Sequence, residues 1–450
     1  MSDGHALLTS VRSRLSSVRH PLVWMVAIGL VLHILAAMLQ FVYDNDYWAL
    51  VIRNIEAGEG LFGVMGYYYT PVWGYILAVV SAFQSVFLDL GADVLRVPEF
   101  FFSEFIDSEL VFCSATVPSI AFSLTVKAPL ILSDLLTALL LRHLVKDVIG
   151  SESKGNLAFM LIFLSPLVIS AACINAMPDT IAALFTVLTV ILVRKDRYLL
   201  AGMTFAVAVL TKFFPAFLLF PLVAYVLVKG DNLRDGAKNV LISMSGAILM
   251  SALIFMPQIL SGNLEQCFQF ITDRTGDSFD DNLFEVIIGK LRLVVYSIVL
   301  LASAFIGYRI FRAGSEGSFN NFMTGAFFTM AMCMLYPPTP QYIIILMPFL
   351  AYWIAVRDRR YMRCWWAISI SAFIFSLSSS ALVLSPIAVW TDLLDVSQVA
   401  SWFTATLEGT TSIALLWSTV FGALTYFGIL SIFLILIVDW RRKGECPIGF

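Results

Sequence analysis

The chain has 450 residues, of which 60% are hydrophobic and only 13% are charged. With a mean hydropathy of +0.88, this composition excludes an ordinary soluble globular domain and indicates a protein that lies in the membrane. The formal net charge of −3 leaves no basic footprint for nucleic acid, so we expect no nucleic-acid partner. The 6 cysteines and 4 histidines are scattered without metal-ligand spacing, which argues against a zinc site or a redox motif.

Apolar stretches recur along the chain at about the 20-residue length that a helix needs to cross a bilayer. They predict an all-α, polytopic membrane protein of about 12 transmembrane helices, with a range of about 11 to 14, in one transmembrane domain over residues 1–450. The predicted helices cover residues 21–42, 118–145, 157–175, 180–193, 199–211, 213–228, 240–256, 284–307, 319–335, 341–356, 364–384 and 412–438. Two of them, 180–193 and 199–211, are too short to cross about 30 Å of hydrocarbon, so we expect their ends to lie inside protein or a water-filled cavity.

Lys and Arg residues set the orientation of these helices. With the N-terminus in the cytoplasm and each helix reversing direction, most of the 28 Lys and Arg residues fall in cytoplasmic segments, as the positive-inside rule requires. Both termini are therefore predicted to be cytoplasmic. The longest outward segment, 43–117, contains an apolar run at 70–88 that either spans the membrane or forms an interfacial or re-entrant helix. We prefer the second interpretation, because a further span would have to fit before Lys127 to keep the charge register.

This outward segment opens with two carboxylates, Asp44 and Asp46, in the sequence Tyr-Asp-Asn-Asp-Tyr-Trp. A positioned carboxylate can take the proton from an acceptor hydroxyl as that hydroxyl attacks the anomeric carbon of a sugar. The same pair can hold a divalent metal ion. A solvated helix end with aromatic interface anchors is the plain structural alternative.

Aromatic and ionisable residues follow the acid pair. The sequence Tyr-Tyr-Tyr-Thr-Pro at residues 67–71 predicts either an aromatic wall, which suits sugar rings, or an interfacial belt. Lys127 and Asp134 lie near one face of the next predicted helix, and intramembrane charges are typical of functional sites. The structural alternatives are that Lys127 reaches to the outer interface and that Asp134 pairs with another helix.

Five further outward positions hold polar candidates. Asp179 and Lys212 lie at the outer ends of the two short helices, where Lys212 either holds a lipid phosphate or anchors the interface. Arg274, in the second long outward segment, either grips a phosphate through two hydrogen bonds or pairs with its acidic neighbours. Gln341 and Tyr342 follow a proline-rich turn that breaks helix continuity.

The order of these elements resembles the GT-C superfamily of membrane glycosyltransferases: Asp-x-Asp after the first helix, Tyr-x-Tyr-Thr-Pro, a Lys-bearing span, short hairpins, a loop Arg and Pro-x-Gln-Tyr. The chain looks most like the catalytic subunit of GPI mannosyltransferase I and prokaryotic polyprenyl-phosphate-dependent glycosyltransferases, over nearly its whole length. In that superfamily the carboxylate of the first outward loop is catalytic, which implies Asp46, our first choice, or Asp44. Lys127 and Asp134 match the superfamily's Gly-Lys and Asp positions, although Val126 replaces the glycine.

The resemblance implies inverting transfer of a hexose, with mannose as first candidate, from a polyprenyl- or dolichol-phosphate donor to a glycan or lipid acceptor at the outer membrane face. A divalent metal at Asp44 and Asp46 is an open option. The implied substrate-binding residues are Tyr67, Tyr69, Lys127, Asp134, Asp179, Lys212, Arg274, Gln341 and Tyr342. A transporter or lipid flippase and a noncatalytic scaffold are the alternatives, but the candidate residues gather near the outer surface, whereas transporters bind substrate near the midplane.

The cellular location follows from the same features. We expect a multi-pass integral membrane protein surrounded by membrane lipids. The short C-terminal tail without a retention signal favours a prokaryotic plasma membrane, and the endoplasmic reticulum membrane is the expectation for a eukaryotic source.

Overall fold

The structure is a computed structural model of the chain. It describes residues 21–39, 42–63, 67, 69–87, 95–96, 116–117, 120–268, 283–335, 340–378, 381–384, 387, 406–407 and 411–443. These residues are almost entirely helical, as the sequence predicts. Two antiparallel pairs of two-residue strands accompany the helices: β1 (Leu95–Arg96) with β2 (Thr116–Val117), and β3 (Thr406–Leu407) with β4 (Thr411–Ser412).

The helices follow one another in a single series along the described chain. In order they are α2 (Pro21–Ala37), α3 (Val42–Glu56), η1 (Leu61–Gly63), α4 (Pro71–Phe87), α5 (Ile120–Ile149), α6 (Glu152–Phe163), α7 (Pro166–Ile169), η4 (Ser170–Ile174), α8 (Asp179–Arg194), α9 (Tyr198–Thr211), η5 (Phe214–Leu218), α10 (Leu219–Lys229), α11 (Leu233–Ser261), η6 (Leu264–Phe268), α13 (Leu283–Ala313), α14 (Ser318–Cys333), η7 (Pro340–Ile345), α15 (Met347–Val356), η8 (Arg359–Tyr361), α16 (Met362–Ser378), η9 (Ala381–Leu384) and α19 (Ile413–Lys443).

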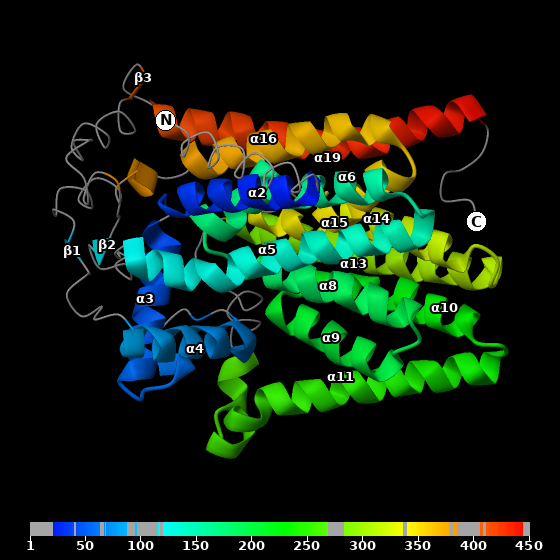
Figure 1. Ribbon diagram of the computed structural model, residues 1–450, viewed down its shortest axis with the longest axis horizontal. Helices are drawn as coiled ribbons and strands as arrows, with labels where there is room; N and C mark the ends of the chain where they lie inside the picture. The colour runs from blue at the N-terminus through cyan, green and yellow to red at the C-terminus, as the bar shows by residue number, and fades with distance from the viewer. Residues whose placement is uncertain are drawn as a thin grey trace, which may run out of the picture.

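Most helices of the bundle run along a common direction, and α3 runs across them at one end (Figure 1). Among the described residues, four helical segments are long and apolar enough to cross a membrane: Ile120–Ile149, Leu233–Ser261, Leu293–Ala313 and Leu416–Arg442. The pair Glu152–Phe163 and Pro166–Ile174, bent by 43°, makes a fifth if it is one span. The predicted helical fold with several apolar spans is thus confirmed, whereas the number of about 12 spans and the cytoplasmic termini stay predictions.

The surfaces and the interior of the bundle are both apolar. Large side chains such as Ile248 on α11, Leu301 on α13 and Phe427 on α19 are exposed, and helix faces of this kind require an apolar solvent such as lipid. Inside, a large core cluster surrounds Phe327 on α14. A second cluster, around Trp48, joins α3 and α4 to the first half of α5. This second cluster sets the position of the acidic motif.

The acidic motif at residues 43–48, expected in a loop, lies instead in the first turns of α3. Its charged residues lower the mean hydropathy of the segment, so hydropathy alone does not predict a helix here. Trp48, Val51 and Ile52 nevertheless recur at helical spacing, and all of them are buried. The carboxylates are therefore held on a packed helix end.

Prolines break two of the predicted helices. The predicted span 157–175 divides at Pro166, after which Ser170–Ile174 forms a π-helical turn. The predicted helix 341–356 is a short 3-10 helix, η7, followed by α15, with Pro348 in the first turn of α15. Proline has no N–H to donate and fits best in the first turn of a helix. A continuous apolar run hides such breaks, because hydropathy does not report hydrogen bonding.

Candidate active site

Lys212 lies at the centre of a cluster of polar and aromatic side chains. Its Nζ atom is 3.4 Å from Oδ2 of Asp179, 4.2 Å from the ring centre of Tyr342 and 5.2 Å from that of Tyr69. A cation over an aromatic face is attracted by about 0.5–2 kcal/mol. Asp44 belongs to the same group, because its carboxylate interacts electrostatically with Lys212 and Asp179. We call Asp44, Tyr69, Asp179, Lys212 and Tyr342 the Lys212 cluster.

The hairpin of α8 and α9 brings the ion pair together. Asp179 is the first residue of α8 and Lys212 directly follows α9, so the two residues meet at the open end of the hairpin. Lys212 leaves the helix with an extended backbone, φ −151° and ψ 135°. Asp179 is fully buried. A buried carboxylate needs a charge partner, and the Lys212 ammonium supplies it.

Tyr69 and Tyr342 reach Lys212 from two other parts of the chain. The hydroxyl of Tyr69 donates to Sδ of Met177 at 3.5 Å. Its neighbour Thr70 donates to the backbone carbonyl of Leu210, one residue before the end of α9. Tyr342 lies on η7, which packs against α8. Each ring is thus fixed by its own element beside the same ammonium group.

Two side chains of α3 fix Asp44 in place. Nε1 of Trp48 donates to the backbone carbonyl of Ala176 at 3.0 Å, and Nδ2 of Asn45 donates to that of Ile174 at 3.4 Å. Trp48 is fully buried, so this hydrogen bond is shielded from solvent. The first turn of α3 is therefore docked on the segment that leads into Asp179.

That segment has an unusual backbone. Ala176 has a φ of 51°, in the left-handed region that side chains other than glycine rarely adopt. It follows the π-helical turn Ser170–Ile174. On the other side, Nδ2 of Asn175 donates to Oγ of Ser376 in α16 at 3.4 Å. π-Turns and strained residues are enriched at functional sites, where the surrounding structure holds them. Here the short segment between the π-helical turn and α8 is bound by α3 on one side and by α16 on the other, and it leads directly into Asp179.

The electrostatics of Asp44 follow from this packing. Burial raises the pKa of Asp44 well above the usual value, the positive charge of Lys212 acts to lower it, and the negative charge of Asp179 raises it further. A carboxylate with a raised pKa accepts a proton more readily once it is ionised. Asp44 therefore has the electrostatic character of a general base, with a cation beside it.

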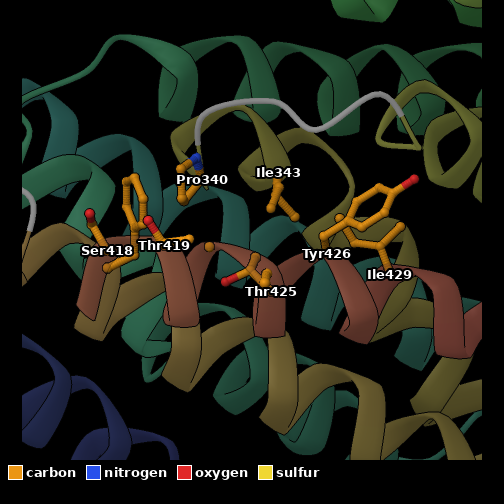
Figure 2. Close-up of a pocket in the computed structure, with 10 residues that line it drawn as sticks. Pro340, Ile343, Ser418, Thr419, Thr425, Tyr426 and Ile429 are labelled. Atoms are coloured by element: carbon orange, nitrogen blue, oxygen red, sulfur yellow. The ribbon is translucent and has the colours of Figure 1, made fainter. Parts of the chain in front are cut away.

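A pocket of about 300 Å³ lies between η7, α16 and α19 (Figure 2). Pro340 and Ile343 form its η7 wall, and Thr425 and Tyr426 face it from α19. Because a 3-10 helix has three residues per turn, Pro340 and Ile343 share one side of η7. Tyr342 lies a third of a turn away. The short helix η7 is thus a common wall of the pocket and the Lys212 cluster.

Lys127 and Asp134, expected to bind substrate, face α2 instead. Nζ of Lys127 donates to backbone carbonyls at the end of α2. Oδ2 of Asp134 is 3.4 Å from Nε2 of His33. The structure thus gives Asp134 the helix partner that was its structural alternative. Among the described residues, no hydrogen bond or ion pair joins either side chain to the Lys212 cluster, so their role in binding substrate stays a prediction.

The remaining predicted residues are placed only in part. Tyr67 is buried, and its hydroxyl donates to the carbonyl of Thr70 at 3.3 Å. This hydrogen bond stabilises the segment that contains Tyr69. Gln341 lies on η7 and is partly exposed. Asp46 is in α3 with its side chain outside the described part, and Arg274 lies wholly outside the described residues. Sequence reasoning missed Trp48, Thr70 and Ala176, which act through backbone carbonyls.

The question of a metal ion centres on the acid pair. Within the described residues, no group of three or more His, Cys, Asp or Glu side chains is arranged to hold a metal. Asp44 and Asp179 are the two carboxylates in the Lys212 cluster, and Lys212 already provides a positive charge between them. A metal site that includes Asp46 stays a prediction.

Fold and site together define a helical membrane protein with a buried acid and base cluster at one end of its bundle. Residues 122–260 match the family described as Dolichyl-phosphate-mannose-protein mannosyltransferase. This match includes Asp179 and Lys212 and confirms the predicted resemblance to GT-C membrane glycosyltransferases over that part of the chain. The solved structure of ArnT from Cupriavidus metallidurans in the apo state is similar, with 13% identity and a TM-score of 0.44, covering 91% of this chain and 75% of that chain. A comparison with curated proteins gives no match.

Proposed function

We propose that this protein is a glycosyltransferase that moves a hexose, with mannose as first candidate, from a polyprenyl- or dolichol-phosphate donor to a hydroxyl of a glycan or lipid acceptor. The main support is the Lys212 cluster, in which a carboxylate with raised pKa stands beside a cation. The family match over residues 122–260 includes two of the three charged residues of that cluster, Asp179 and Lys212. The outer membrane face is the proposed place of the reaction, because the positions of Lys and Arg along the chain predict that Asp44, Asp179 and Lys212 lie on the outward side.

Asp44 acts as the base in this proposal. It takes the proton of the acceptor hydroxyl while the hydroxyl oxygen forms a bond to the anomeric carbon. The bond from that carbon to the phosphate oxygen breaks, and its electron pair leaves with the lipid phosphate. Attack from the face opposite the phosphate inverts the configuration. The sequence makes Asp46 the first choice, but the carboxylate of Asp44 interacts electrostatically with Lys212 and Asp179.

Lys212 stabilises the negative charge that collects on the departing lipid phosphate. Asp179 keeps the ammonium group in place from within the protein. The rings of Tyr69 and Tyr342 flank the same group and offer apolar faces against which a sugar ring packs. Arg274 and Gln341 are proposed as further phosphate and sugar contacts.

The pocket beside η7 is our proposed position for the first part of the isoprenoid chain. Its wall combines apolar side chains such as Ile343 and Phe375 with the hydroxyls of Thr419 and Thr425. The shared η7 wall puts a lipid chain in this pocket close to a phosphate held at Lys212. Exposed apolar faces of α19 beside it continue the path into the membrane.

The experiment that tests this function is sugar transfer by the purified protein in lipid nanodiscs. A panel of labelled polyprenyl- and dolichol-phosphate sugars is supplied with membrane extract as a source of acceptor, and product configuration at the anomeric carbon is determined. We expect one hexose donor to be consumed with inversion. Consumption of no donor across the panel contradicts a transferase and directs attention to transport assays.

A further inference from the structure

Lys127 is a buried lysine that the proposed reaction does not use. Its side chain has no exposed surface, and among the described residues no carboxylate lies within ion-pair distance of it. A charge in such a place is expensive unless other groups compensate for it. The compensation comes from backbone: Nζ donates to the carbonyl of Ala37 at 2.9 Å and to that of Leu39 at 2.8 Å.

The carbonyl of Ala37 belongs to the last residue of α2, and that of Leu39 lies two residues beyond the helix. The last carbonyls of a helix have no partner within the helix and bear the negative end of its dipole, so a cation there is stabilising. Ala37 is the last residue of α2, and α3 begins at Val42. Lys127 therefore holds the corner between the two helices, and α5 supplies the anchor.

Asp44 lies just beyond this corner, between two sets of anchors. On its N-terminal side Lys127 holds Leu39. On its C-terminal side Trp48 holds α3 against the carbonyl of Ala176. The two anchored residues, Leu39 and Trp48, thus flank Asp44 along the chain.

We propose that Lys127 is a positioning residue: it binds no substrate, but fixes the corner between α2 and α3 so that Asp44 faces Lys212. The proposal rests on the proposed function only in taking Asp44 as the base. It replaces the expectation that Lys127 binds substrate. It also explains why a lysine is used, because an ammonium group with several donors can join two carbonyls at once.

His33 and Asp134 provide a matched control on the same two helices. They also join α2 to α5, with Oδ2 of Asp134 at 3.4 Å from Nε2 of His33, but their contact lies about one turn before the end of α2. His33→Leu removes a buried polar contact between α2 and α5, as Lys127→Met does. It leaves the carbonyls of Ala37 and Leu39 with their partner.

The first test measures position directly and needs no activity. Spin labels are placed at Leu50→Cys on α3 and at Phe213→Cys beside Lys212, both exposed in the structure. Cys113 and Cys446 are replaced by serine, since Cys173, Cys267, Cys333 and Cys364 are buried. We expect Lys127→Met to broaden or shift the distance distribution between the labels and His33→Leu to leave it unchanged. An unchanged distribution in Lys127→Met overturns the proposal.

The second test reads the consequence for catalysis, per folded protein. We expect Lys127→Met to lower kcat by about 10- to 100-fold with little change in donor KM, since small misplacements of a reacting group have effects of this size. In an Asp44→Asn background the same substitution should have almost no further effect. A rise in donor KM at constant kcat identifies a phosphate ligand and overturns the proposal, as does full additivity with Asp44→Asn.

The two tests separate this inference from the proposed function. If wild type transfers no sugar, the function fails, while the distance measurement still decides whether Lys127 sets the corner. If wild type is active and the distance distribution is unaffected by Lys127→Met, the positioning role fails and the function stands.

Discussion

Two lysine and aspartate pairs lie at opposite ends of the hairpin formed by α8 and α9, and they differ in their surroundings. At the turn, Nζ of Lys229 is 2.7 Å from Oδ1 of Asp196, whose side chain is 61% exposed. The same carboxylate accepts a hydrogen bond from Tyr198 at 2.6 Å, and Lys229 also donates to the carbonyl of Val193. Both members of this pair thus form further hydrogen bonds with neighbouring groups.

At the open end of the hairpin, the carboxylate is buried and the pair has fewer hydrogen-bond partners. Asp179 has no exposed surface and lies 3.4 Å from Lys212. Lys212 faces two aromatic rings and a second carboxylate, Asp44, in place of carbonyl acceptors. A cation held this way keeps hydrogen-bonding capacity for an incoming anion. The two pairs have the same residue types, so residue type alone does not tell whether an ion pair is structural or reactive. The burial of the pair and the hydrogen-bonding capacity that it has left separate the two cases.

The largest expected effect comes from removing the base. Asp44→Asn should lower kcat by about 100- to 10,000-fold, because general base catalysis contributes that much. The steady-state rate of sugar transfer, normalised to folded protein, checks this. Asp46→Asn is the companion variant: a loss confined to Asp46→Asn would assign the base to Asp46 and contradict the role of Asp44.

Removing the cation of the Lys212 cluster should have the next largest effect. Lys212→Met is expected to lower kcat by about 100- to 1,000-fold, because the departing phosphate loses its charge partner. Lys229→Met, the matched substitution at the other end of the hairpin, should change kcat by no more than about threefold. Equal losses in the two variants would remove the distinction between the two pairs.

The pH dependence of transfer sharpens the comparison. Because the pKa of Asp44 is raised, its protonated form, which cannot act as a base, persists to higher pH than for an ordinary aspartate. Activity should therefore fall as the pH is lowered through this raised pKa. Lys212 lowers the pKa of Asp44, so Lys212→Met should move the acid limb of the kcat profile to higher pH. A limb that stays in place in this variant argues against the Asp44 assignment.

The smallest effect is expected at the exposed pair. Asp196→Asn should change the free energy of unfolding by less than about 1 kcal/mol, because exposed ion pairs contribute little. Asparagine also tolerates the left-handed conformation of this residue, whose φ is 59°. Thermal unfolding in detergent measures the change. A loss of transfer activity in this variant, with folding intact, would show that the turn takes part in the reaction.

The sequence predicts which residues belong to the Lys212 cluster better than it predicts how these residues are arranged. Tyr69, Asp179, Lys212 and Tyr342 were expected on one side of the membrane, and the structure brings them around one ammonium group. Charge patterning made this possible, since the positions of Lys and Arg reveal the direction of each span. The outward ends of separate spans must then lie at the same face.

Three features were out of reach of sequence reasoning for physical reasons. The sequence predicts a loop in place of α3, because hydropathy averages over the charged face of this helix. The left-handed Ala176 gives no signal, since alanine has no preference for that conformation. Lys127 pairs with backbone carbonyls of α2, and every residue has a carbonyl, so no side-chain pattern identifies the partner.

The most direct test of the central claim is a single-turnover experiment with labelled polyprenyl-phosphate mannose, bound to purified wild type, Asp44→Asn and Asp196→Asn in nanodiscs. Acceptor is then added, and formation of labelled product is followed in time. The account predicts that all three proteins bind donor, that wild type and Asp196→Asn form product at similar rates, and that Asp44→Asn forms almost none. Product formation by Asp44→Asn at the wild-type rate would contradict the claim that the Lys212 cluster is the reaction centre.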